Sequence, residues 1–196
     1  MKATRMILAA FVLVMMAGSA MATEYTYQPG DKDLADLPHG KAYLWGIQPN
    51  IAAGETLTHV SIVFKSLLNT GGKPNDIWIT LIDSAPLGVT EFVDNQASSN
   101  YFAGDGLELA HYHNLPWYTW KLTYWFSDAE IAIVNNYVAD NNFGIGIDPD
   151  CHFYNCGVEL KLVTEPGGGQ VPVPEPVAGT ILLGGSGVLA ARRRRS

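Results

Sequence analysis

Apolar and polar residues alternate with a period of two in several segments of this chain, and this pattern constrains the fold more than any other feature. Val60, Ile62 and Phe64, for example, fall on one face of an extended segment. Such alternation is typical of strands with one buried and one solvated face. Alternation or a short apolar run predicts strands over 42–47, 58–65, 77–82, 118–126, 143–148 and 158–162. We therefore expect an all-β domain built as an antiparallel β-sandwich.

The segment 118–126 is rich in aromatic residues. One face of this expected strand carries the row Tyr118, Trp120, Leu122, Tyr124 and Phe126. Trp117 and Trp125 fall on the opposite face. Exposed tryptophan rings can stack on sugar rings, whereas most tryptophans in a sandwich belong to the core or to its edges. Trp117 and Trp125 are therefore candidate glycan contacts.

One short helix interrupts the expected strands. Ser127-Asp128-Ala129-Glu130 has the form of a capping box, which marks the start of a helix. Ile131, Val134 and Val138 follow at helical spacing. We expect this helix to close one end of the sandwich.

Both ends of the chain have the composition of targeting segments. At the N-terminus, positive residues precede an apolar stretch over 6–18, and Ala20-Met21-Ala22 supplies the small residues that a signal peptidase accepts. We expect 1–22 to be a cleavable signal peptide. A retained anchor is the alternative, but the apolar stretch is shorter than the ~20 residues that a membrane span needs.

The C-terminal end, 173–196, combines a short motif, an apolar segment and a basic cluster. Val-Pro-Glu-Pro occupies 173–176, and 177–191 contains no charged residue. Four arginines follow: Arg192, Arg193, Arg194 and Arg195. As a hydrophobic helix the apolar segment would extend ~22 Å, less than the ~30 Å of a bilayer core. This length favours a temporary anchor in the inner membrane, with the arginines in the cytoplasm and the domain outside.

These three ordered features resemble the PEP-CTERM sorting signal of Gram-negative bacteria. The resemblance implies recognition by an exosortase, a membrane-embedded transpeptidase-like enzyme, with Pro174, Glu175 and Pro176 as the recognised motif. It also implies a setting of exopolysaccharide production and of a biofilm or floc matrix. We expect a protein that is exported, transiently anchored in the inner membrane, and then located at the cell surface or outside the cell.

Between the two ends we expect one domain over 23–165, followed by a Gly/Pro linker over 166–172. The chain has 19 acidic and 12 basic residues, and its two ends contain six of the basic residues but only Glu175 of the acidic ones. The domain therefore keeps 18 acidic and 6 basic residues. So acidic a domain repels phosphate backbones, which argues against nucleic acid as a partner.

Two segments of the domain show a second resemblance, separate from that of the C-terminal end. DLADLPHGKAYLWGI (33–47) and FGIGIDPDCHFYN (143–155) resemble jelly-roll domains of exported bacterial proteins with no assigned role. The resemblance implies a jelly-roll-like sandwich and no particular activity.

Asp148-Pro149-Asp150, with Asn155 in reach, is the most site-like polar cluster. Two carboxylates on a turn can direct oxygen atoms at one point, as Ca²⁺ requires with its roughly 6 to 8 oxygen ligands. Aspartate and asparagine are also common turn residues that bond their own backbone. Asp148, Asp150 and Asn155 are therefore a candidate site for a structural calcium ion, with ordinary turn chemistry as the alternative.

Two further pairs of residues could form a disulfide or bind a metal. Cys151 and Cys156 are the only cysteines, and in an exported domain we expect them to form a disulfide. His111 and His113 would lie on one face of a strand, where they could share a transition metal. The sequence places no carboxylate or third histidine with them, so ordinary surface histidines are the alternative.

The sequence contains no recognisable catalytic motif. Gly184-Gly185-Ser186-Gly187 lacks the second glycine of a serine elbow, because Val188 occupies that position. We therefore expect a non-catalytic structural or binding domain. The alternatives are a calcium-dependent carbohydrate-binding module acting on exopolysaccharide and a secreted polysaccharide hydrolase. The expected partners are signal peptidase, an exosortase-like enzyme, the inner membrane and exopolysaccharide.

Overall fold

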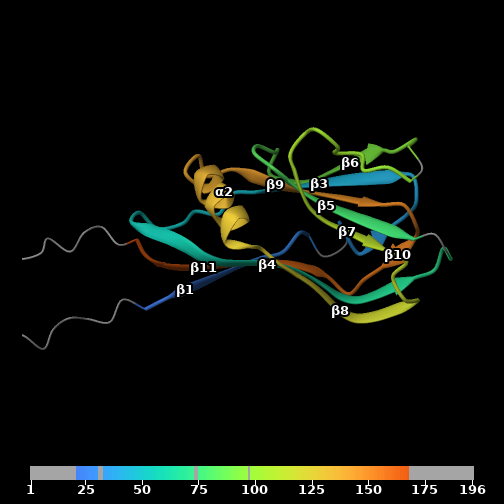
Figure 1. Cartoon of the computed structure of the whole chain (residues 1–196), viewed down its shortest axis with the longest axis horizontal. Helices are drawn as coiled ribbons and strands as arrows, with labels where there is room; N and C mark the ends of the chain where they lie inside the picture. Colours follow the sequence, from blue (N-terminus) through green and yellow to red (C-terminus); the bar gives the residue numbers. More distant parts are fainter. Residues whose placement is uncertain (1–20, 31–32, 73–74, 97, 168–196) are drawn as a thin grey trace, which may run out of the picture.

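The computed structural model describes residues 21–30, 33–72, 75–96 and 98–167 (Figure 1). The expected signal peptide up to residue 20 and the whole expected sorting signal over 173–196 lie outside these residues. Within the described ranges, the structure has no helix with both the length and the apolar character needed to cross a membrane.

Strands make up most of the described chain. In chain order, the elements are β1 (Thr23–Tyr27), β2 (Asp36–Leu37), β3 (Lys41–Ile47), β4 (Glu55–Asn69), β5 (Asp76–Ile82), β6 (Gly88–Val93), β7 (Leu107–His113), β8 (Tyr118–Trp125), α2 (Asp128–Val138), β9 (Phe143–Pro149), β10 (Phe153–Tyr154) and β11 (Val158–Pro166).

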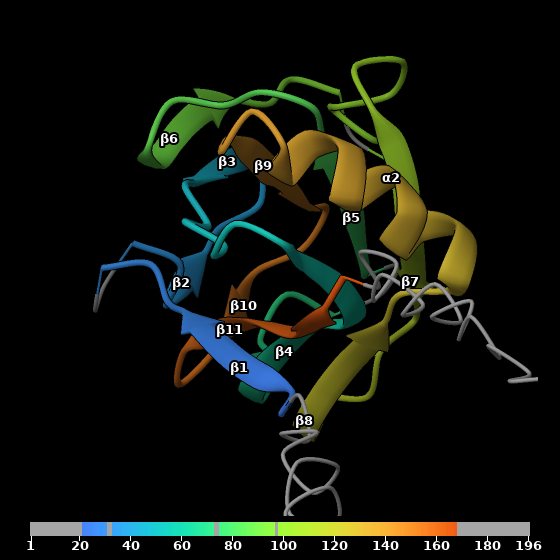
Figure 2. The same cartoon turned by 90° about the vertical axis from the view of Figure 1, so that its left-hand side faces the viewer.

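The strands form two antiparallel sheets. Sheet A has the order β1-β11-β4-β10-β2, and β8 also pairs with the long strand β4. Sheet B has the order β6-β3-β9-β5-β7. Figure 2 shows β6, β3, β9 and β5 of sheet B above β1, β11, β4 and β8 of sheet A. The expected all-β antiparallel β-sandwich is confirmed.

The core lies between the two sheets and is built by the predicted alternation. Ile62 and Phe64 of β4, and Ile145 and Ile147 of β9, are fully buried in one hydrophobic cluster. Each of these strands therefore directs one face inward, as the period of two requires.

Five strands were not predicted from the sequence. Three of them, β1, β6 and β7, lie at the edges of their sheets, and their side chains are largely half-buried or exposed. The other two, β2 and β10, have two residues each. Edge strands and very short strands lack a continuous dry face, so their apolar pattern is weak.

The outward face of β9 is also covered. Gly144 and Gly146 alternate with the core residues, and a Cβ atom on Gly146 would lie only 2.7 Å from the ring of Phe102. Phe102 packs there with Ala42 and Ile82 in a second, smaller cluster. The glycines thus leave room for the segment after β6 to pack on sheet B.

The helix α2 begins as predicted. The Ser127 hydroxyl accepts a hydrogen bond from the Glu130 N–H, and the Glu130 carboxylate accepts one from the Ser127 N–H at 2.6 Å, which completes the capping box. Ile131 and Val134 are buried in the core. The helix packs against β4 and β9 at one end of the sandwich (Figure 1).

Candidate functional site

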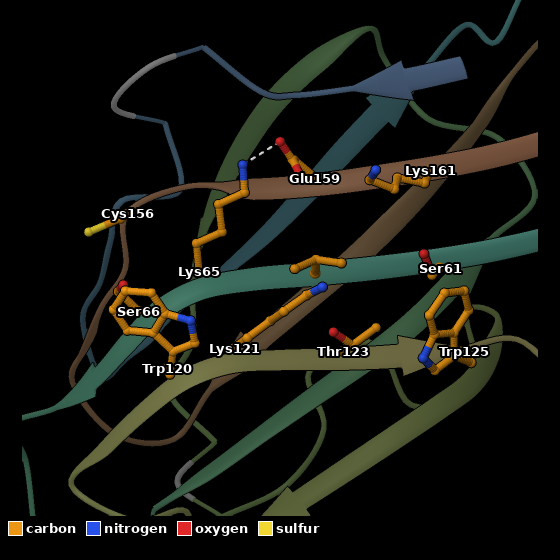
Figure 3. Close-up of a pocket in the computed structure, with 11 residues that line it drawn as sticks. Ser61, Lys65, Ser66, Trp120, Lys121, Thr123, Trp125, Cys156, Glu159 and Lys161 are labelled. Carbon is orange, nitrogen blue, oxygen red and sulfur yellow. Dashed lines mark hydrogen bonds and ion pairs between the residues drawn. The ribbon is translucent and has the colours of Figure 1, made fainter. Parts of the chain in front are cut away.

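A groove of about 490 Å³ lies on the outer face of sheet A. Strands β4, β8 and β11 supply most of its lining, and Cys156 adds to one end. Trp120 and Trp125 lie at the two ends of the groove, with Lys121 and Thr123 between them on β8 (Figure 3). Four residues lie between the two tryptophans, and the five steps of extended strand correspond to ~17 Å along β8.

Both tryptophans of the groove are largely exposed. The exposed fraction is 74% for Trp120 and 66% for Trp125. A tryptophan side chain is a large hydrophobic surface that proteins ordinarily cover, and its ring face can pack on another flat apolar surface. The two rings therefore provide uncovered contact area at both ends of one groove.

Trp120 points outward because the alternation in β4 changes phase at Ser66. Ser66 has a left-handed φ of 50°, and the buried positions change from even-numbered residues such as Phe64 to odd-numbered ones such as Leu67. Trp120 of β8 lies opposite Ser66, between the pairs that join Lys65 to Lys121 and Leu67 to Thr119. The alternation in the sequence assigns Trp120 to the same row as Phe126, and this assignment is wrong.

The groove also concentrates positive charge. Lys65, Lys121 and Lys161 line it, and they are half of the six basic residues in 23–165. Glu159 is the one acidic lining residue. The domain as a whole is strongly acidic, so the groove is a locally basic region on an acidic surface.

Two of the lysines are held by ion pairs. The Lys65 ammonium contacts the Glu159 carboxylate, and this hydrogen bond is the main cause that lowers the pKa of Glu159 (Figure 3). The Lys161 ammonium lies 3.0 Å from Glu24, whose hydrogen bond raises the pKa of Lys161. Lys121 has no ion pair among the described residues, so its charge is available to a ligand.

The structure separates the predicted tryptophan pair. Trp125 lines the groove, but Trp117 precedes β8 and lies outside it. Trp117 is 74% exposed and packs beside Tyr118, with ring centroids 6.5 Å apart. The sequence pattern thus identifies Trp125 and misses Trp120, because only the phase change at Ser66 turns Trp120 toward the groove.

The expected disulfide is not formed, and both cysteines are free in the structure. Cys151 Sγ contacts Asn69 at the end of β4, whereas the Cys156 N–H donates to the carbonyl of Lys65, earlier in that strand. Cys151 is buried against Gly71, where a Cβ atom would lie 2.3 Å from its sulfur. Cys156 is exposed at the groove.

The candidate calcium residues are only partly brought together. The side chain of Asn155 forms its hydrogen bonds away from the two aspartates. Its amide nitrogen donates to the Leu34 carbonyl, and its amide oxygen accepts from the Gly157 N–H. Asp94 joins Asp148 and Asp150 instead, with the three carboxylates within 4.8 Å of one another. Asp94 lies far away in the sequence, so no local pattern indicates it.

These carboxylates are buried. The exposed fractions are 0% for Asp148, 6% for Asp94 and 9% for Asp150. Burial raises the pKa of Asp148 to about 7 and also raises the pKa of Asp150. The ionised form of each carboxyl is disfavoured because burial removes the water that would stabilise its charge.

The histidine pair has a carboxylate neighbour that the sequence did not identify. Asp76 of β5 pairs with β7, and its carboxylate lies 2.5 Å from His113 Nδ1 and 3.7 Å from His111 Nε2. His111 also stacks on Trp78, with ring centroids 4.2 Å apart. Asp76, His111 and His113 thus bring three possible ligand atoms within 4.8 Å of one another.

Comparisons of this chain with models of protein families, with curated proteins and with solved structures find no match.

Proposed function

We propose that the domain over 23–165 is a non-catalytic binding domain for acidic extracellular polysaccharide, and that the groove on sheet A is its binding site. The observation that carries this proposal is the pair of exposed tryptophans at the ends of a groove with three lysines in its lining.

The two chemical features of the groove fit one class of ligand. Sugar rings present flat apolar faces that pack on tryptophan, and an elongated chain can contact both rings at once. Carboxylate or sulfate groups on the same chain would pair with Lys121 and with the lysines beside it. A polymer of acidic sugars combines both features.

The lining of the groove supports binding rather than hydrolysis. Glycoside hydrolysis ordinarily uses two carboxyl groups ~5 to ~9.5 Å apart on either side of the bond. Glu159 is the single carboxylate among the lining residues, and Lys65 contacts it. The groove therefore offers no acid–base pair for a polysaccharide hydrolase.

The proposal includes export and sorting. The segment 1–22 would direct secretion, and 173–196 would be recognised by an exosortase-like enzyme after transient anchoring in the inner membrane. The support is the order of the motif, apolar segment and arginine cluster at the chain end. This route would deliver the groove to the compartment that contains exopolysaccharide.

Alanine variants of the tryptophans test the binding site. We expect the purified full chain to be retarded in affinity electrophoresis through gels that contain alginate, a polyuronate. Trp120→Ala and Trp125→Ala should each weaken this interaction at least ~10-fold, because each removes a ring contact worth about 1.4 kcal/mol or more. Trp117→Ala is the matched control, since Trp117 is as exposed as Trp120 but lies outside the groove.

Three results would contradict the proposed function. One is an equal loss for Trp117→Ala and Trp120→Ala, which would place binding outside the groove. Another is unchanged retardation of both groove variants. The third is the absence of any retardation of the wild-type chain by alginate and by a sulfated polysaccharide.

A further inference from the structure

A buried cluster of three carboxylates lies on sheet B, on the opposite side of the sandwich from the groove. Asp148 belongs to β9 and alternates with the core residues Ile145 and Ile147, so it points away from the core. Asp150 follows the end of β9, and Asp94 follows the end of β6. The groove, by contrast, is on the outer face of sheet A.

Several oxygen atoms of this cluster have no hydrogen-bond partner. They are Oδ1 of Asp148 and the carboxylate oxygens of Asp150, and all are inaccessible to solvent. The backbone of Ser98 lies near enough to lower the pKa of Asp150, but no side chain of the described residues donates to it, and burial outweighs this contact. Asp148 is completely buried. A buried polar atom without a partner is costly, and a buried charge without a partner is costlier still.

No lysine or arginine among the described residues pairs with these carboxylates, and the effect of His39, which lowers the pKa of Asp150, is outweighed by burial and by Asp94. None of the ion pairs in the described part of the chain includes Asp94, Asp148 or Asp150. Three carboxylates whose oxygen atoms lie within 4.8 Å of one another repel when ionised. Either protons or a bound cation must neutralise the cluster in the folded protein.

We propose that Asp94, Asp148 and Asp150 bind a calcium ion. The set consists entirely of oxygen ligands, which hard cations prefer to the nitrogen and sulfur ligands that zinc and copper select. The unpartnered oxygens of Asp148 and Asp150 would become ligands, and water and backbone carbonyls ordinarily supply the remaining ligands of calcium.

The ion would fasten a loop to sheet B. The other oxygen of Asp148 accepts a hydrogen bond of 2.7 Å from the Tyr101 N–H. The next residue, Phe102, packs over Gly146 and closes the second hydrophobic cluster. A cation that holds Asp94 and Asp148 together would therefore stabilise the covering of sheet B without touching the groove.

Calcium titration of the purified full chain tests this site. After treatment with EDTA and its removal, isothermal titration with CaCl₂ should show one saturable site, and saturating calcium should raise the Tm by about 5 °C or more. Asp148→Asn and Asp150→Asn should abolish both effects. Their calcium-free Tm should equal or exceed that of the calcium-free wild type, because an amide removes a repulsive charge.

Matched variants test whether calcium binds at this cluster or elsewhere on the domain. Asp105→Asn replaces an exposed carboxylate of the same loop region and should leave the calcium response unchanged. His113→Ala should also leave it unchanged, which excludes the neighbouring histidine cluster as the binding site. Retardation by a sulfated polysaccharide below the Tm should be the same with EDTA and with calcium, since the two sites lie on different sheets.

The absence of calcium-dependent heat and of a Tm shift in the wild type would overturn this proposal, and would mean that protons neutralise the cluster. A calcium response that survives Asp148→Asn and Asp150→Asn would also overturn it. If one variant fails to fold, the other still decides, together with the unchanged responses expected of Asp105→Asn and His113→Ala. Neither result depends on the proposed function of the groove.

Discussion

At the scale of single residues, Ser66 decides the shape of the groove. Its left-handed backbone shifts the buried face of β4 by one position, and the opposite residue, Trp120, then points outward. L-residues other than glycine, asparagine and aspartate rarely adopt this conformation. Leu67, on the other side of the phase change, is buried in the core.

Substitutions of Ser66 should separate backbone strain from side-chain chemistry. We expect Ser66→Gly to retain or raise the free energy of unfolding, because glycine accepts a positive φ without steric cost. Ser66→Val should lower it by ~1 to ~2 kcal/mol and weaken polysaccharide binding, because a β-branched residue resists the left-handed region. Urea denaturation of both variants measures the difference, and equal stabilities would show that the conformation of Ser66 is not required.

Glu55 joins three strands through its carboxylate. Thr23 and Tyr25 of β1 and Thr164 of β11 donate hydroxyl hydrogen bonds to it at 3.2, 2.8 and 2.7 Å. These bonds, that from Thr164 foremost, lower the pKa of Glu55. Since hydrogen bonds to the ionised form are the stronger ones, Glu55 supports the edge of sheet A only when it is charged.

The sign of this effect predicts how stability depends on pH. A carboxyl group whose pKa is lower in the folded state contributes stability above its unfolded pKa, near 4.5, and loses it as the pH falls through the folded value. Glu55→Gln should therefore lower the Tm by a few degrees at pH 7. The difference from the wild type should shrink below pH 4.

Thermal denaturation between pH 3 and pH 7 measures this trend. Glu165→Gln is the control, because Glu165 is an exposed residue of the same sheet and no side-chain hydrogen bond to it is formed within the described ranges. A constant Tm difference between Glu55→Gln and the wild type across this pH range would contradict the assignment.

At the scale of the elements, three strands assemble the charge of the groove. Lys65 comes from β4, Lys121 from β8 and Lys161 from β11. Each lies at an outward position of its strand, as the alternation predicts. Their gathering, however, depends on the pairing of β4 with both β8 and β11.

Lys121 should contribute to binding through its charge. We expect Lys121→Gln to weaken retardation by alginate several-fold at low ionic strength, because Lys121 is the groove lysine without an ion pair in the described structure. The effect should fade at about 0.5 M salt, where exposed charges are screened.

The matched control for Lys121 is Lys41→Gln. Lys41 pairs with Glu91 on sheet B and lies away from the groove. Affinity electrophoresis at two salt concentrations compares the two variants. An equal effect of both would indicate that net charge alone, and not the groove, determines the interaction.

At the scale of the whole molecule, the two proposed sites lie on different sheets. Sheet A presents the groove, and sheet B carries the covered carboxylate cluster. A calcium-dependent carbohydrate-binding module in the strict sense would need the ion at the sugar, and the proposed ion lies behind the other sheet. Calcium would then control the stability of the domain, while the groove controls recognition.

Local features of the chain determined much of this protein. The period of two, together with short apolar runs, identified six strands, the capping box at Ser127 located α2, and the count of charges showed that 23–165 is acidic. Each of these features involves residues near one another in the sequence. Strand and helix periodicities express such local geometry directly, so they can be recognised without the fold.

Only the tertiary structure decided which distant residues meet. Because of the phase change at Ser66, Trp120 lines the groove and the predicted Trp117 does not. Because the segment after β6 packs on β9, Asp94 joins the carboxylate cluster and the predicted Asn155 does not. Contacts with different parts of β4 likewise separate Cys151 from Cys156. These outcomes depend on strand pairing and on the packing of a loop against a sheet, and a local pattern contains no information about either.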